Sequence, residues 1–128
     1  EVIIPVSATT IADSISVDLP RDGVRAVRAA VETNGAYIKV ADEQIIKAIA
    51  DLGVHGIFAE PAGSTALAGL KQALADGTIS PDDPVLVINS GNGLKDVRAA
   101  MMAVPNAAII EPTMPALKQH LKKREMRK

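Results

Sequence analysis

The sequence predicts an α/β fold in which a partial parallel sheet is flanked by helices. Apolar residues alternate along the chain between helical spacing and short continuous runs, which is the order typical of parallel α/β domains. The run Val85–Ile88 is continuous and mostly β-branched, as in a strand covered on both faces. Because only three short strands are predicted, we expect this chain to form part of a sheet.

Length and composition indicate one globular unit. The chain has 128 residues, enough to bury a core. Hydrophobic residues make up 48 % and charged residues 23 %, which argues against intrinsic disorder. The chain begins at Glu1 instead of methionine, and its sheet is incomplete. We therefore expect residues 1–128 to be a single domain fragment whose N-terminal portion is absent.

Several function classes are excluded by composition. The sequence has no cysteine, which removes disulfides, thiolate metal sites and thiol nucleophiles and is compatible with the cytoplasm, where we expect the protein to act. Tyr37 and Phe58 are its two aromatic residues, so no stacking platform for nucleic acid is expected. No apolar run approaches the roughly 20 residues of a membrane span. His55 and His120 lack metal-ligand companions, so no metal site is expected.

Charge is unevenly distributed, although the formal net charge is only −1. Six of the 14 basic residues lie among residues 118–128, and the rest of the chain is acidic. A basic tail can bind phosphates, but cations also stabilise the negative end of a helix dipole. The acidic body favours the helix interpretation, without a nucleic-acid partner.

The first forty residues are predicted to contain two helices of very different length. Prolines and aspartates interrupt residues 1–21, leaving one short helix near Ile11–Ile15. A valine stripe at i, i+3 and i+7 then predicts a helix that begins after Asp22 and ends near Asn34. Residues 36–40 follow as the first strand candidate.

Two further helices are predicted in the middle of the chain. Asp42 can cap a helix with an apolar face that Gly53 ends. Glu60 and Pro61 open the next helix, where the missing proline N–H is tolerated. One side of this second helix is formed largely of small residues that allow close approach to a sheet: Ala66, Gly69, Leu70, Ala73 and Leu74.

The other two strand candidates are residues 57–59 and 85–88. The second is followed by the turn Ser90–Gly93, which leads into another helix. A last helix is predicted from Pro115 to Arg124.

Ligands of open α/β sheets lie beyond the carboxyl ends of the strands, and two segments qualify. In the first, Ser90 places a hydroxyl at a strand tip, and Gly91 permits close approach of a ligand. A plain strand–helix turn explains the same pattern. In the second, Glu60 either caps its helix or faces the same crevice as Ser90. These features alone predict part of an α/β ligand-binding domain.

Several segments together resemble the C-terminal part of the threonine synthase family. They are TIADSISV at residues 10–17, LPRDGVRAVRA at 19–29, FAEPAG at 58–63, SGNGLKD at 90–96 and IEPT at 110–113. The match covers nearly the whole chain in the family's order. The SGNG turn is shared more widely by pyridoxal-phosphate enzymes of the tryptophan-synthase-β fold type, whereas the first two segments point to threonine synthases within that fold type.

This resemblance implies a two-domain fold-type II enzyme with pyridoxal 5'-phosphate in the cleft between the domains. Residues 1–128 would be the C-terminal part of the large cofactor-binding domain of a homodimeric lyase. Its reaction would convert O-phospho-L-homoserine and water into L-threonine and phosphate. The resemblance also implies that Ser90, beside Gly91, hydrogen-bonds the pyridine nitrogen, and that Glu60 lies near the cofactor ring.

The family's Schiff-base lysine and phosphate-binding loop belong to its N-terminal portion. None of Lys39, Lys47, Lys71 and Lys95 has the family's lysine motif around it. We therefore expect no catalytic residue in this chain, which alone would lack the cofactor and activity. A hydroxyl can donate to a neutral pyridine nitrogen without holding it protonated, as a carboxylate would. Our hypothesis is that Ser90 sets the protonation state of that nitrogen.

Two alternatives stay open on the sequence. The parent enzyme could be threonine dehydratase or another fold-type II lyase, which differs in its leaving group. The chain could also be a binding module that kept the fold and lost the chemistry. In either case a truncated sheet exposes apolar edges, so we expect the fragment to self-associate.

Overall fold

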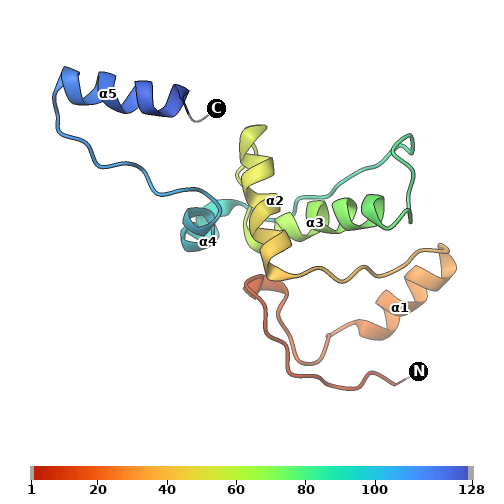
Figure 1. The fold of residues 1–128 in the computed structure, drawn as a ribbon. Coiled ribbons are helices and arrows are strands. Elements are labelled where there is room, and N and C mark those ends of the chain that lie inside the picture. The colour runs from red at the N-terminus through yellow and green to blue at the C-terminus, as the bar shows by residue number, and fades with distance from the viewer. Residues whose placement is uncertain (1, 127–128) are drawn as a thin grey trace.

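A computed structural model describes residues 2–126 as a set of helices joined by long irregular segments (Figure 1). Glu1, and Arg127 and Lys128 of the basic tail, lie outside the described residues. The elements in chain order are η1 (Asp13–Ile15), α1 (Gly23–Glu32), α2 (Asp42–Val54), α3 (Pro61–Ala75), η2 (Gly93–Lys95), α4 (Val97–Met102) and α5 (Met114–Glu125). Each predicted helix is therefore present close to its expected bounds.

The core lies where α2 and α3 cross (Figure 1). Ile45 and Ala48 of α2 pack with Ala68 of α3 and with Ala12 of the N-terminal arm, and all four are buried. The apolar faces that the sequence gives to these helices meet here, and removal of this surface from water stabilises the pair. By contrast, α1 and α5 stand away from this centre and contain no buried residue.

The segment that precedes η1 is held against the start of α2 by the carboxylate of Asp42. Asp42 Oδ1 accepts a 2.6 Å hydrogen bond from the Thr10 hydroxyl, and Oδ2 accepts one of 3.1 Å from the Ile11 amide. The prediction that Asp42 caps α2 is therefore wrong, because Ala41 occupies the N-cap position. Gln44 accepts a 2.7 Å bond from the Ala41 amide instead. Asp42 thus positions η1 against the core.

The helix ends follow the local signals in the sequence. Asn34 has a φ of 53°, the left-handed conformation that asparagine tolerates after a helix. Gly53 was expected to end α2, but the helix continues to Val54 with His55 at its C-cap. The last turn of α5 carries three cations, Lys122, Lys123 and Arg124, which suits the dipole interpretation of the basic tail.

The described residues form no β-strand, so the predicted parallel sheet is not present within residues 2–126. The bridge between Ala59 and Asn92 is isolated and antiparallel. Residues 36–40 and 85–88 have no regular structure, and Leu86 is 87 % exposed. A ladder exists only where a neighbouring strand supplies the facing donors and acceptors, and no described segment lies beside these two in that way.

The small-residue side of α3 nevertheless lies beside the run at residues 85–88 that was predicted to be a strand. Ala66, Gly69 and Ala73 line one side of an open groove of about 310 Å³, and residues 85–88 line the other. Ile38, from the first strand candidate, reaches the same groove. The predicted strand segments and the predicted sheet-facing side of α3 are thus neighbours in space. Among residues 2–126, none of the helices combines the length and apolar character that a membrane span requires.

Candidate functional site

The two segments singled out by the sequence are joined by backbone hydrogen bonds. The Glu60 amide donates to the Gly91 carbonyl at 3.1 Å, and the Gly93 amide donates to the Phe58 carbonyl at 3.0 Å. These bonds flank the isolated bridge between residues 59 and 92. The turn after the apolar run is therefore fixed to the start of α3, in a unit that we call the turn–helix junction (residues 58–63 and 89–95).

At Gly63 and Gly91 of this junction, as at Gly93 beside the Phe58 ring, other atoms occupy the space that a side chain would need. A Cβ added to Gly91 would lie 1.8 Å from Glu60 Oε1. One added to Gly63 would lie 2.3 Å from Asn89 Oδ1 and 3.1 Å from the Gly91 backbone. Neither glycine has a positive φ, so the cause is close approach and not conformational freedom. The glycines of FAEPAG and SGNG thus allow these two segments to touch.

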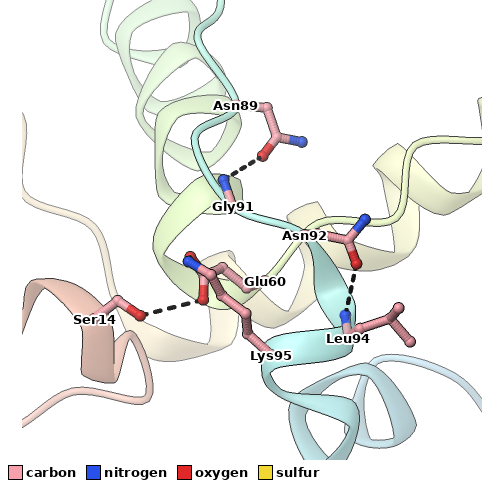
Figure 2. A network of polar contacts seen from close by, with 7 residues as sticks. All are labelled: Ser14, Glu60, Asn89, Gly91, Asn92, Leu94 and Lys95. Atoms are coloured by element: carbon pink, nitrogen blue, oxygen red, sulfur yellow. Dashed lines mark hydrogen bonds and ion pairs between the residues drawn. The ribbon is translucent and has the colours of Figure 1, made fainter.

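Glu60 is a buried carboxylate held by side chains from two distant segments (Figure 2). It occupies the N-cap position of α3, but its side chain makes no capping hydrogen bond. Instead, Oε1 accepts from Lys95 Nζ at 2.8 Å and Oε2 accepts from the Ser14 hydroxyl at 3.2 Å. The capping interpretation of the Glu60 side chain is therefore wrong. Its carboxylate links η1, α3 and η2.

A small polar recess lies beside this carboxylate. Its volume is about 80 Å³, well below the roughly 300 Å³ at which ligand pockets begin, so it can form only one corner of a larger site. The charged and hydroxyl groups around it are Asp13, Ser14, Glu60, Lys95 and Asp96. Ser90 does not line this recess, so the crevice that Glu60 was predicted to share with Ser90 stays a prediction.

Ser90 is exposed in the turn of the turn–helix junction. Its hydroxyl makes no hydrogen bond to any described residue, so it is free to bind a group from outside this part of the chain. The two residues that flank Ser90 are hydrogen-bonded to each other, because Asn89 Oδ1 accepts a 3.4 Å bond from the Gly91 amide. Ser90 is therefore presented by a turn whose following residue contacts Glu60, and it is not buried in the core.

Lys95 and Ser14 were not predicted to contact Glu60. Lys95 is 35 residues from Glu60 in sequence, so no local pattern connects the two. Its side chain is 59 % exposed, as that of an ordinary surface lysine would be. The local signal lies in Asn92, whose Oδ1 accepts a 2.9 Å bond from the Leu94 amide and starts the tight turn of η2. That turn brings Lys95 back over the start of α3 (Figure 2).

Among the described residues, acidic and histidine side chains do not gather into a metal site. Within residues 2–126, no group of three or more metal-ligating side chains comes together. His55 ends α2, whereas His120 lies in α5. The turn–helix junction is therefore the candidate site that both the sequence and the structure support.

A comparison with protein families agrees with this geometry. A family model described as "Pyridoxal-phosphate dependent enzyme" matches residues 1–91. The chain belongs to this family. Membership supports the α/β class, and the match includes the apolar run, Ser90 and the start of α3.

The chain is also similar to curated proteins named threonine synthase. It is 38 % identical over 115 residues to that of Halalkalibacterium halodurans, covering 88 % of this chain and 32 % of the relative. It is 39 % identical over 114 residues to the threonine synthase of Methanocaldococcus jannaschii, covering 88 % of this chain and 28 % of the relative. It is 35 % identical over 100 residues to that of Mycobacterium tuberculosis, covering 77 % of this chain and 28 % of the relative. The resemblance to threonine synthases is thereby confirmed, and the chain spans less than a third of each of these relatives.

Proposed function

We propose that residues 1–128 are the C-terminal part of the cofactor-binding domain of a threonine synthase. The complete protein would convert O-phospho-L-homoserine and water into L-threonine and phosphate. The observation that carries this proposal is the similarity to proteins of that name over 77–88 % of the chain. Threonine dehydratase, the other enzyme considered, is not favoured, because these three relatives all carry the name threonine synthase.

The residues present fit one end of pyridoxal 5'-phosphate. The Ser90 hydroxyl is exposed and has no partner among the described residues, and the next residue, Gly91, has no side chain. Such a hydroxyl can approach the flat ring of the cofactor and donate a hydrogen bond to the ring nitrogen. When bound, the cofactor supplies an electron sink for negative charge that develops on the amino-acid substrate. Ser90 would bind the pyridine nitrogen, and Gly91 would allow the close approach.

Glu60 would lie at the edge of that ring. Its carboxylate is in contact with the Gly91 backbone and is kept there by two side-chain hydrogen bonds. A carboxylate that is fixed and shielded from water acts strongly on neighbouring charge, because little solvent screens it. Glu60 is accordingly proposed as a cofactor-binding residue that contributes position and charge.

The parallel sheet would be completed in the full-length protein. Residues 36–40 and 85–88 lie as unpaired chain beside the small-residue side of α3. We propose that strands from the rest of the protein pair with them and fill the groove, as the two-domain architecture of the family resemblance implies. Leu86 and Ile88, which are 87 % and 72 % exposed, would then become buried.

The proposed partners follow from the same architecture. The substrate is a small phosphorylated amino acid, and the complete protein is proposed to be a homodimer that acts in the cytoplasm. The isolated chain exposes large apolar side chains along much of its length, including Val31, Leu86 and Ile109. Exposed apolar surface of this extent favours association, so we propose that the isolated chain self-associates.

The complete protein tests the proposed function. Loaded with pyridoxal phosphate, it should release phosphate from O-phospho-L-homoserine and form L-threonine in equal amounts, whereas residues 1–128 alone should do neither. Ammonia production from L-threonine, without phosphate release from the phosphorylated substrate, would instead identify a dehydratase. Failure to bind the cofactor at all would favour the interpretation as a binding module.

A further inference from the structure

We infer that Lys95 is a positioning residue, which fixes the turn carrying Ser90 by holding the buried carboxylate of Glu60. This inference rests on the proposed function, because it concerns the turn that is proposed to bind the cofactor ring. The interaction joins Lys95 Nζ to Glu60 Oε1 at 2.8 Å (Figure 2).

The ion pair completes a set of three links between the same two segments. Two links are backbone hydrogen bonds, from the Glu60 amide to the Gly91 carbonyl and from the Gly93 amide to the Phe58 carbonyl. The third is the side-chain link between Glu60 and Lys95. Lys95 follows the turn and Glu60 precedes α3, so the ion pair adds a side-chain link to the backbone bonds that join these two segments.

Burial makes Glu60 dependent on this lysine. The Glu60 side chain is only 5 % exposed, and a carboxylate removed from water is costly unless it is paired and hydrogen-bonded. Lys95 provides the opposite charge and Ser14 provides a second donor. Without the ammonium group, the carboxylate would retain one neutral donor and would be driven towards solvent.

Movement of Glu60 would be transmitted directly to the turn. Its Oε1 lies where a side chain on Gly91 would begin, at 1.8 Å from the ideal Cβ position, so the carboxylate packs against the Gly91 backbone. Gly91 is the neighbour of Ser90. A displaced carboxylate would therefore loosen the residue that sets where the Ser90 hydroxyl points.

The lysine is well placed for this role because only its end is engaged. Its side chain remains 59 % exposed while the ammonium group reaches the buried oxygen. The comparable pair between Lys71 and Asp51 links α3 to α2 and is exposed on both sides. Lys71 thus offers a matched control, because its loss removes a lysine–carboxylate pair without touching the turn–helix junction.

The test compares Lys95→Met, Lys95→Arg and Lys71→Met in the complete protein. In the cofactor-free protein, Lys95→Met should speed hydrogen exchange at the Glu60 and Gly93 amides by about tenfold, because a charge-assisted link that closes the junction is lost. After loading with pyridoxal phosphate, the same variant should shift the absorbance spectrum of the bound cofactor. Lys95→Arg should restore both properties, and Lys71→Met should leave both as in the wild type.

Unchanged exchange and an unchanged cofactor spectrum in Lys95→Met would overturn the inference. If that variant does not fold, Ser14→Ala removes the other donor to Glu60 and should speed exchange at the same amides by a smaller factor; wild-type exchange in that variant would contradict the inference equally. Exchange is measured without cofactor, so it judges the positioning role even if the wild-type protein fails to release phosphate. That second failure would reject the proposed function alone.

Discussion

The N-terminal end of α3 and its small-residue side differ in how far their neighbours are present in the described chain. Its N-terminal end is fixed to the turn at residues 90–93 by backbone bonds and a buried ion pair. Its small-residue side faces residues 85–88 across an open groove, without a hydrogen-bonded neighbour in the described chain. The comparison teaches that the turn–helix junction, which is proposed to contact the cofactor, is already closed within residues 2–126, whereas the sheet is proposed to need strands from the rest of the protein.

The largest effect on this contrast is expected from Gly91→Ala. The new methyl group would lie 1.8 Å from Glu60 Oε1, so either the carboxylate or the turn must move. Overpacking of this kind costs about 1–3 kcal/mol. We expect a loss of that size in denaturant unfolding of the complete protein, and weaker pyridoxal phosphate binding in a titration.

Gly53→Ala is the matched control for this substitution. Gly53 lies in α2 with no atom within 4 Å of its ideal Cβ position. Alanine is the better helix former there, so this variant should be as stable as the wild type or slightly more stable. Equal stability of the two alanine variants would show that the turn–helix junction is not tightly packed.

A smaller effect is expected on the open side of α3, from Leu86→Lys. Leu86 is 87 % exposed in the isolated chain and forms part of the groove wall. The variant should reduce self-association of residues 1–128 in sedimentation while leaving helix content unchanged, because a charge on an exposed apolar edge opposes pairing.

Val54→Lys serves as its control, since Val54 is 83 % exposed at the end of α2, away from the groove. It should leave self-association close to the wild-type level. A strictly monomeric wild-type chain would refute the proposed exposure of a pairing edge. In the complete protein, by contrast, Leu86→Lys should destabilise the fold, because the groove is proposed to be filled there.

The smallest effect concerns pH. A hydrogen bond from Lys71 lowers the pKa of Asp51 below its ordinary value of 3.8. Since the folded pKa is the lower one, this pair contributes stability above pH 3.8 and loses it as the pH falls through the folded pKa. Asp51→Asn should therefore melt slightly below the wild type at neutral pH, with the difference shrinking in acid and in high salt. A difference that grows in acid would have the wrong sign.

The helices were predictable because their signals are local. The valine stripe of α1, Pro61 at the start of α3 and the cations that end α5 all act within a few residues of their positions. The contacts that the sequence did not reveal are long-range. Lys95 meets Glu60 across 35 residues, and the carboxylate of Asp42 binds Thr10 across 32.

The sheet marks the limit of that local reasoning. Residues 85–88 were predicted to be a strand and form none among the described residues, although they lie beside the side of α3 that was predicted to face a sheet. An apolar run forms a strand only when partners supply its hydrogen bonds. Asp42 and Glu60 were predicted as possible caps of their helices, yet their side chains bind other segments instead. Long-range partners can override a local capping preference.

The most direct test of the central claim is the absorbance spectrum of bound cofactor in Ser90→Asp, with Ser90→Thr as the control. In the complete protein, a carboxylate at this position would hold the pyridine nitrogen protonated, so the spectrum should shift and threonine formation should fall, whereas threonine keeps the hydroxyl and should preserve both. A wild-type spectrum and wild-type turnover in Ser90→Asp would contradict the assignment of Ser90 to the cofactor ring.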